Sequence, residues 1–346
     1  MFEFSHNANK FYNIGVYLMN NYIAFSDYNR LKYELHEIYG ISVDTVELIS
    51  DYCASVYMLS ATDKKYIFKL YRTFDTEIAL QSARIMNYLS AQSFPVAPII
   101  RTKEGGLTHT MTFPQGNMTG MVLDFIDGKK GWDFEFKDYA VKIGEIMGCM
   151  HDLMEKCDIP IIEYGFEHYV GRYINIMREF GYSPSRIEEL EELGKELWEN
   201  VAKTKRGFCH GDFNVSNFIV TPNGEYYIFD FDCGGISYRI KDIYCICCMT
   251  ETIFDFNIEN IMNYVEFYDK ISLIRQGYER QHGLNEYDIK AVYSFVGIGC
   301  YWSAGQSNKY RSLLEGNRHW ITEQYFDKRY NWLMTWKNLC KDKCIT

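Results

Sequence analysis

The stretch that decides the fold reads FCHGDFNVSN at residues 208–217 and resumes as YYIFDFD at residues 226–232. It sets two carboxylates and an amide at fixed offsets, as Asp212, Asn217 and Asp230. Phosphoryl transfer needs such a set. One carboxylate orients the attacking hydroxyl, while an amide oxygen and a second carboxylate hold Mg²⁺ against nucleotide phosphates. The pattern therefore predicts a magnesium-dependent phosphoryl-transfer site.

The 13 positions that separate Asn217 from Asp230 fit a tight hairpin. Residues 218–220 read as one short strand, residues 221–224 as a turn and residues 226–229 as the returning strand. A hairpin of this length brings the amide and the second carboxylate close together.

A plainer interpretation exists for each half of the motif. H-G-D is a common tripeptide, and an Asp or Asn before a strand is usually turn chemistry. Asp230 is harder to explain in this way, because Phe229 and Phe231 flank it. An acid in a buried strand needs a partner or a metal ion.

The combination H-G-D-x-x-x-x-N followed by a strand ending in D-F-D resembles the aminoglycoside phosphotransferase and choline kinase superfamily, which shares the protein-kinase fold. The resemblance implies that Asp212 is the catalytic base and that Asn217 and Asp230 are Mg²⁺ ligands. It implies that His210 braces the catalytic loop. Asp232 matches a second acid that many members carry, and is a further candidate metal ligand. ATP and Mg²⁺ are the implied cofactors.

Upstream, residues 46–49, 56–59 and 65–71 alternate as three strands separated by turns. Lys69 lies late in the third strand, where an inward-facing ammonium needs an anion. By resemblance it contacts the α- and β-phosphates of the nucleotide. The alternative is a lysine on the wet face of a half-exposed strand.

The turn at residues 50–55 is expected to cover the phosphates, although it contains no glycine. Backbone N–H groups and the Ser55 hydroxyl are its candidate contacts. The absence of a glycine-rich loop, together with H-G-D in place of H-R-D, argues against a protein kinase.

Residues 76–89 predict a helix that carries the partner of Lys69. Glu77 is the candidate, although the family places this acid closer to the helix middle, near Gln81 or Ser82. An acid in the first turn is also favoured by the helix dipole alone.

Two further strands are expected at residues 108–112 and 119–125, followed by a hinge. By resemblance, backbone groups from Asp124 to Ile126 bind the adenine edge. A plain strand that ends in an Asp-Gly turn predicts the same residues.

The rest of the chain predicts helices. An apolar stripe from Tyr139 to Met154 indicates one of them, in which His151 is expected to be structural. Asp242 matches an acid that anchors the catalytic loop in kinase-fold proteins. The acceptor site is expected in the last hundred residues, with the candidates Glu251, Asp255, Tyr301, Trp302 and Glu323.

Bulk composition narrows the class of protein. The chain has 346 residues, of which 47% are hydrophobic, and a net charge of −10. The charge disfavours nucleic acid as a partner and suits a cationic acceptor. Most of the eleven cysteines, including Cys245, Cys247 and Cys248, are read as free thiols in a reducing cytoplasm. No apolar run approaches the roughly 20 residues that span a bilayer, and the first residues do not resemble a signal peptide.

Together these features predict an α+β, two-lobed protein-kinase-like fold. A helical extension (1–40, with helices near 11–20 and 30–39) precedes an N-lobe (41–123), a hinge (124–128) and a helical C-lobe (129–346). We expect a kinase that phosphorylates a small alcohol, such as an aminoglycoside, an amino alcohol, a sugar or homoserine. The alternative is a non-catalytic scaffold of the spore-coat type. The sequence does not indicate an oligomeric state.

Overall fold

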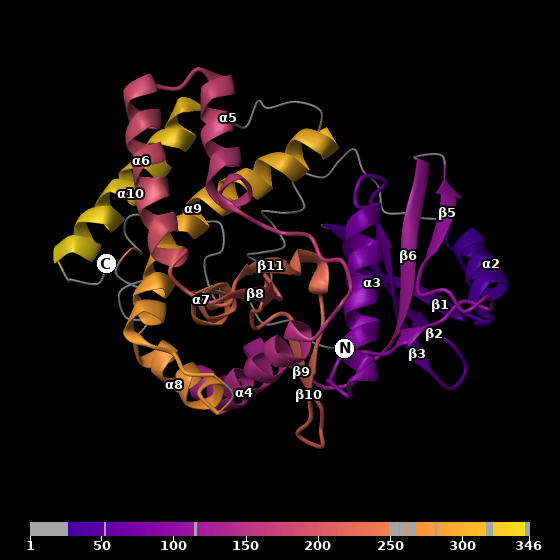
Figure 1. Cartoon of the computed structure of the whole chain (residues 1–346). Helices are drawn as coiled ribbons and strands as arrows, with labels where there is room; N and C mark the ends of the chain where they lie inside the picture. The colour runs from indigo at the N-terminus through magenta and orange to yellow at the C-terminus, as the bar shows by residue number, and fades with distance from the viewer. Residues whose placement is uncertain are drawn as a thin grey trace. The chain divides into compact units, whose positions relative to one another are not determined.

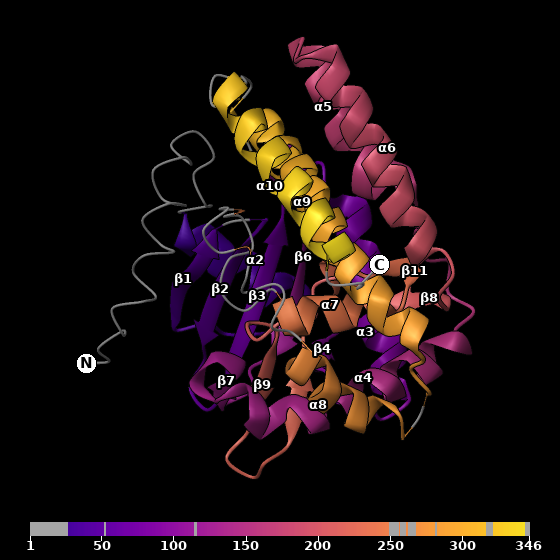
Figure 2. The ribbon, with the colours of Figure 1, turned by 90° about the vertical axis from the view of Figure 1, so that its left-hand side faces the viewer.

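The computed structural model describes residues 27–51, 53–113, 116–248, 256, 261, 268–280, 282–315 and 321–342. The helix expected near residues 11–20 lies outside this part of the chain. Two compact units are present (Figures 1 and 2). The first contains the described residues up to Ala83, the segment Pro98–Phe125 and the described residues from Asn308 to Glu315. The second contains Arg84–Ala97 and most of the chain from Ile126 onward.

The first unit is built on an antiparallel sheet. Its strands are β1 (Thr45–Asp51), β2 (Ala54–Ser60), β3 (Lys65–Tyr71), β4 (Ile99–Ile100), β5 (His109–Phe113) and β6 (Gly116–Asp124). The strand order is β1-β2-β3-β6-β4, and β5 also pairs with β6. The strands predicted from the alternating pattern are confirmed to within a few residues. They are β1, β2, β3, β5 and β6, whereas the two-residue strand β4 was not predicted.

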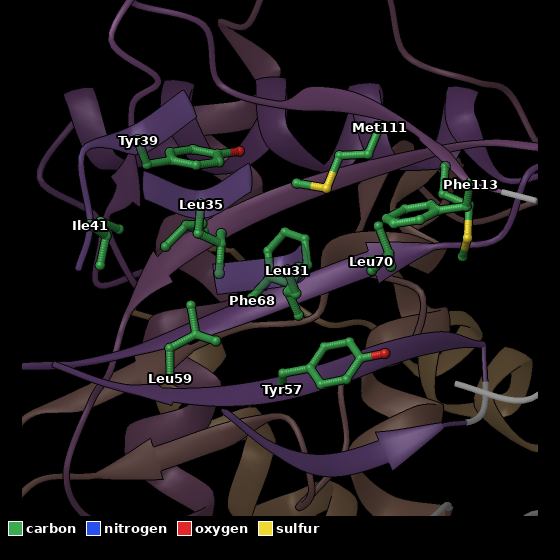
Figure 3. Packing of buried hydrophobic residues seen from close by; sticks show 12 residues of the cluster. Leu31, Leu35, Tyr39, Ile41, Tyr57, Leu59, Phe68, Leu70, Met111 and Phe113 are labelled. Atoms are coloured by element: carbon green, nitrogen blue, oxygen red, sulfur yellow. The ribbon is translucent and has the colours of Figure 1, made fainter. Parts of the chain in front are cut away.

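Helix α2 (Tyr28–Tyr39) covers one face of this sheet and confirms the helix expected near residues 30–39. The Asp27 side chain caps its N-terminus, and Gly40 ends it in a left-handed conformation. Phe68 and Leu70 of β3 point into the same core as Leu31 and Leu35 of the helix (Figure 3). Because strand side chains alternate between faces, Lys69 belongs to the opposite face.

Helix α3 (Thr76–Ala91) confirms the helix predicted over residues 76–89. Its buried side chains recur at helical spacing, as Ala79, Ala83, Met86 and Leu89 show. The helix supplies residues to both units, since the division of the chain falls after Ala83.

In its described residues, the second unit is mainly helical and contains short strand pairs. Its helices are α4 (Phe136–Glu155), α5 (Arg172–Phe180), α6 (Pro184–Val201), α7 (Ile240–Cys248), α8 (Tyr268–Tyr278), α9 (Glu286–Glu315) and α10 (Glu323–Asp342). Its strands are β7 (Lys129–Lys130), β8 (Arg206–Cys209), β9 (Phe218–Val220), β10 (Tyr226–Ile228) and β11 (Gly235–Tyr238). Strand β9 pairs with both β7 and β10, and β8 pairs with β11.

Helices α4 and α8 approach each other at two glycines. An added Cβ at Gly144 would fall on the carbonyl oxygen of Ile274, and one at Gly277 would fall on that of Val141. Only glycine allows two backbones to come so close. In the described part of the chain, no helix combines the length and apolar character needed to cross a membrane.

We predict that Gly277→Ala lowers the free energy of unfolding. Alanine favours the helix by up to about 1 kcal/mol, but the backbone clash costs about 1–3 kcal/mol, so we expect a net loss of about 1–2 kcal/mol in a urea titration. Gly283→Ala is the control, because an added Cβ there meets no atom within 4 Å. Equal stability of the two variants would contradict the close crossing.

Candidate active site

The predicted hairpin is present in the second unit. Strands β9 and β10 pair antiparallel, with Phe218 opposite Ile228. The pairing continues one step further, because the Phe229 N–H donates to the Asn217 carbonyl at 3.1 Å. Asn217 and Asp230 therefore leave the hairpin at the same end.

The Asp212 carboxylate is held by two amide side chains. The Nδ2 atom of Asn214 donates to its Oδ1 at 2.8 Å, and the Nδ2 atom of Asn217 donates to its Oδ2 at 2.9 Å. Burial raises the pKa of Asp212 to about 7 and the negative charge of Asp230 acts in the same direction, while the amide donors and Lys241 oppose them. A carboxylate with this pKa is suited to accepting a proton near neutral pH.

Asn217 is oriented by its contacts with Asp212. Its Nδ2 atom donates to the Asp212 backbone carbonyl at 2.8 Å as well as to the carboxylate. Because the amino end of the amide is used in this way, its Oδ1 atom faces the other side, where the Ser216 hydroxyl lies 3.2 Å away. An amide oxygen fixed in this manner can serve as a metal ligand.

Asp230 has a left-handed backbone conformation, with φ 69° and ψ 60°. This conformation is strained for a residue other than glycine, and such strain clusters at functional sites. The negative charge of Asp230 is close enough to raise the pKa of Asp212. Two neighbouring carboxylates beside an amide oxygen form a donor set that suits a hard divalent cation.

Among the described residues, no group of three His, Cys, Asp or Glu side chains could hold a metal ion alone. Asp232, the further candidate ligand, is half-buried in a 3₁₀ turn at Phe231–Cys233, directly after Asp230.

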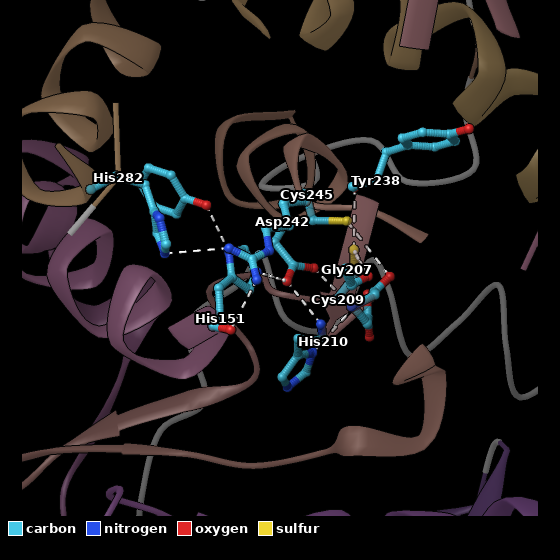
Figure 4. A network of polar contacts seen from close by, with 12 residues as sticks. His151, Gly207, Cys209, His210, Tyr238, Asp242, Cys245 and His282 are labelled. Carbon is cyan, nitrogen blue, oxygen red and sulfur yellow. Dashed lines mark hydrogen bonds and ion pairs between the residues drawn. The ribbon is translucent and has the colours of Figure 1, made fainter. Parts of the chain in front are cut away.

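Asp242, the acid of helix α7, is fully buried and anchors the loop that follows strand β8 (Figure 4). Its two oxygens accept the backbone N–H groups of His210 and Gly211, each at 2.8 Å. His151 of α4 lies 3.0 Å from the same carboxylate, and its other ring nitrogen lies 2.8 Å from the Tyr278 hydroxyl of α8. Burial alone would raise the pKa of Asp242, but these hydrogen bonds hold it below its ordinary value.

His210 links the two halves of the motif. Its Nε2 atom lies 3.0 Å from the Phe229 carbonyl, which can only accept, so Nε2 carries the proton. Its Nδ1 atom then accepts the Asp212 N–H at 3.3 Å. Burial lowers the pKa of His210, so the ring stays neutral. Gly211 has φ +81°, and an added Cβ there would clash with the Cys233 carbonyl.

Ser55 lies in strand β2 rather than in an open turn. Strand β1 runs on to Asp51 and strand β2 begins at Ala54, so the ends of the predicted turn belong to the strands. The buried Ser55 hydroxyl donates to Asp51 at 2.7 Å, and Arg72 forms an ion pair with the same carboxylate at 2.5 Å. The Ser55 side chain therefore braces the hairpin.

Lys69 is half-buried on the sheet face opposite the α2 core, and its Nζ atom lies 5.2 Å from the Tyr71 ring centroid. Glu77 is exposed in the first turn of α3 and forms no ion pair within the described residues. Gln81 and Ser82, one turn later, are buried. The structure does not bring Glu77 and Lys69 together, because the helix turns the acid outward.

Asp124 ends strand β6. Its carboxylate pairs with Lys64 at 2.5 Å, and its backbone N–H donates to the Pro98 carbonyl at 2.9 Å. The Asp124 N–H is therefore already hydrogen-bonded within the first unit. Ile126 follows the strand and is half-buried.

The acceptor candidates fall in different surroundings. Tyr301 is fully buried and its hydroxyl donates to a backbone carbonyl of α6, which indicates a structural role. The Trp302 ring lies 4.8 Å from the Nζ atom of Lys241. Glu323 is exposed at the start of α10. Glu251 and Asp255 lie outside the described residues.

Sequence reasoning missed Asn214 and Lys130. Asn214 could have been found as the second amide of the loop, two residues after the proposed base. Lys130 donates to the Ser216 carbonyl at 3.1 Å and lies 3.9 Å from the Phe229 ring centroid. Burial lowers its pKa to about 8. No local pattern identifies Lys130, since its contacts come from residues far along the chain.

Comparison with known proteins places these features in a family. A model of the phosphotransferase enzyme family matches residues 45–280. An uncharacterized protein of Deinococcus radiodurans is 20% identical over 222 residues, which are 60% of this chain and 62% of that protein. The chain thus spans less than two thirds of the length of this curated relative.

Solved structures share the architecture. The amicoumacin kinase hAmiN, in complex with AMP-PNP, Ca²⁺ and Ami, has a TM-score of 0.66 at 18% identity, covering 93% of this chain and 95% of its own. A microcompartment-associated aminopropanol kinase has a TM-score of 0.67 at 15% identity, covering 90% and 95%. The choline kinase LicA from Streptococcus pneumoniae has a TM-score of 0.57 at 16% identity, covering 89% and 98%. These likenesses confirm the predicted α+β, two-lobed kinase-like fold.

We predict that Asp242→Asn destabilises the protein. An amide supplies one acceptor oxygen where the carboxylate supplies two, so a buried N–H of His210 or Gly211 loses its partner. We expect a loss of about 2–4 kcal/mol in the free energy of unfolding, measured by denaturant titration.

Asp152→Asn is the matched control for this change. Asp152 lies next to His151 on α4 and contacts His282 at the surface, with 36% of its side chain exposed. We expect this variant to change stability by less than about 1 kcal/mol. A loss of the same size in both variants would argue against Asp242 as the anchor.

Proposed function

The chain belongs to the phosphotransferase enzyme family, and from this premise we propose that it is a kinase for a small molecule. In this proposal it transfers the terminal phosphoryl group of ATP, with Mg²⁺, to a hydroxyl of the acceptor. Aminoglycosides, amino alcohols, sugars and homoserine are the acceptor classes considered. The main support is the shared hydrogen bonding of Asp212 and Asn217, which fixes a proton acceptor and an amide oxygen in one rigid loop.

Asp212 is the proposed base. Asn214 and Asn217 hold its two oxygens in place, so the carboxylate meets an incoming hydroxyl without prior rearrangement. Its raised pKa lets it accept the hydroxyl proton as the new bond to phosphorus forms. His210 and Asp242 act on this residue only through the backbone, as positioning residues.

Asn217 and Asp230 are the proposed metal ligands, with Asp232 as the weaker third candidate. Mg²⁺, when bound, neutralises the charge that develops on the phosphate oxygens. The residues of this chain hold both ligands in place before an ion binds. The hairpin positions Asn217 and Asp230, and the hydrogen bond from the Asn217 side chain to Asp212 orients its amide.

For the nucleotide, we propose that the Lys69 ammonium contacts the phosphates and that backbone groups around Ile126 contact the adenine. The Asp124 N–H has a different role, since it bonds to Pro98. We assign Ser55 to bracing the hairpin through Asp51 rather than to direct phosphate contact. Glu77 is not needed as a partner in this proposal, because it is exposed.

A non-catalytic scaffold is the second candidate. The exposed position of Glu77 favours it, because an active kinase usually pairs an acid with the strand lysine. Against it stands the convergence of Asp212, Asn217 and Asp230, since a scaffold does not need a strained acid beside a second acid whose pKa it raises.

We predict that Mg-ATP stabilises the protein against thermal unfolding, because a ligand of the folded state adds stability by mass action. At a concentration one hundred times Kd the gain is about 2.7 kcal/mol. Asp230→Ala abolishes this gain. Asp212→Asn keeps it but lowers the rate of phosphoryl transfer by about 10²–10⁴-fold, measured as ADP release with an acceptor panel.

Asp63→Ala, an exposed acid in the turn between β2 and β3, is the control and leaves both readouts unchanged. Absence of any thermal shift with wild-type protein at millimolar Mg-ATP would support the scaffold. Turnover by Asp212→Asn at the wild-type rate would overturn the assignment of the base.

A further inference from the structure

Lys130 lies in the two-residue strand β7, which pairs with β9 of the hairpin. Neighbouring side chains of a strand point to opposite faces, and Lys129 is exposed while Lys130 is half-buried. The backbone on both sides of β7 packs closely. An added Cβ at Gly128 would lie 2.5 Å from a carbonyl oxygen of β9, and one at Gly131 would lie 2.6 Å from that of Val215, in the loop before the hairpin. The position of the Lys130 backbone is therefore fixed.

The Lys130 ammonium contacts both halves of the proposed metal site. Its Nζ atom donates to the Ser216 carbonyl at 3.1 Å and lies 3.9 Å from the Phe229 ring centroid. Ser216 directly precedes Asn217 in the chain. Phe229 directly precedes Asp230. One side chain from outside the motif thus contacts the residue before each proposed ligand, and all of these residues belong to the second unit.

The charge of Lys130 also acts on this site. Burial lowers its pKa to about 8, while the negative charges of Asp230 and of the exposed Asp133 act in the opposite direction. The side chain is therefore mostly an ammonium at pH 7. Asp230 needs a counter-charge, because it lies near the Asp212 carboxylate and raises its pKa. Two such carboxylates repel each other when no cation balances them.

A fixed ammonium and a divalent metal ion repel each other, because both are positive. The ammonium of Lys130 therefore stabilises Asp230 in the metal-free protein and, by the same charge, lowers the affinity of the site for a metal ion. Salt screens this repulsion less than it screens a pair of surface charges, since Lys130 and Asp230 are both half-buried.

We propose that Lys130 is a positioning residue that balances the charge of Asp230 until Mg²⁺ binds, and that its ammonium limits how tightly the site holds the ion. This inference rests on the proposed function and deepens it, because it assigns a role in metal binding to a residue outside the motif that carries the proposed ligands.

The first test measures Mn²⁺ binding to the full chain at pH 7 without nucleotide, by electron paramagnetic resonance, which reports the free ion. Lys130→Met removes the charge and keeps a side chain of similar length. We expect it to bind Mn²⁺ about 3–30-fold more tightly than wild-type protein. A merely structural role predicts the opposite, because loosened ligands bind an ion less tightly. Adding Asp230→Asn is expected to reverse the gain, which assigns it to the proposed site.

Lys129→Met is the matched control, because it removes the same charge from the exposed neighbour on the same strand. Solvent screening limits its expected effect on Mn²⁺ affinity to less than about twofold. Lys130→Arg keeps the charge and is expected to keep the wild-type affinity.

The second test is a double-mutant cycle of Lys130→Met and Asp230→Asn, measured by denaturant titration in EDTA. Asparagine removes the charge and still tolerates the left-handed backbone at this position. We expect Lys130→Met to lower the unfolding midpoint about twice as much when Asp230 is present as in the Asp230→Asn background, because in that background the ammonium has already lost its partner. This readout requires neither metal nor activity.

Three results would overturn the inference. They are a Mn²⁺ affinity of Lys130→Met equal to or lower than that of wild-type protein, a gain of the same size in Lys129→Met or Lys130→Arg, and additive effects in the double-mutant cycle. The proposed function fails separately, if wild-type protein shows no thermal shift with Mg-ATP.

Discussion

The hydrogen bonds from the His210 and Gly211 backbone to Asp242 are the interaction on which the rest of the site depends. A loop in this conformation has buried N–H groups that no helix or strand satisfies, and leaving them unpaired is costly. The Asp242 carboxylate at the start of α7 accepts both of these N–H groups. Its own position is set by His151 and Tyr278, which sit on the two helices that cross at Gly144 and Gly277 (Figure 4). The packing of α4 against α8 thus fixes the position of Asp242, and Asp242 in turn fixes the backbone of the loop at His210 and Gly211.

Sequence reasoning recovered the parts of the structure that are local. The alternation of residues 46–71 predicted three strands, and the spacing from Asn217 to Asp230 predicted a hairpin, because both patterns follow from backbone geometry alone. The resemblance carried by H-G-D and D-F-D supplied the fold class, which the solved structures confirm. The roles of the individual site residues stay proposals.

Contacts between distant segments could not be predicted. The ion pair of Arg72 with Asp51 joins the end of β3 to the end of β1. Ser55 was expected in an open turn, but its hydroxyl donates to the same Asp51 from within a strand. Glu77 was predicted as the partner of Lys69 from its residue type and its position in the helix. The orientation of α3 exposes Glu77 and buries Gln81 instead.

The central claim is that the hairpin delivers the Asn217 amide oxygen and the Asp230 carboxylate to one divalent cation. A crystal structure with Mn²⁺ and AMP-PNP, recorded at the manganese absorption edge, tests it most directly. We expect an anomalous peak about 2.0–2.3 Å from both oxygens, with the Asn217 Nδ2 atom still donating to Asp212. A peak ligated by other residues, or an Asn217 amide turned away from a bound ion, would contradict it.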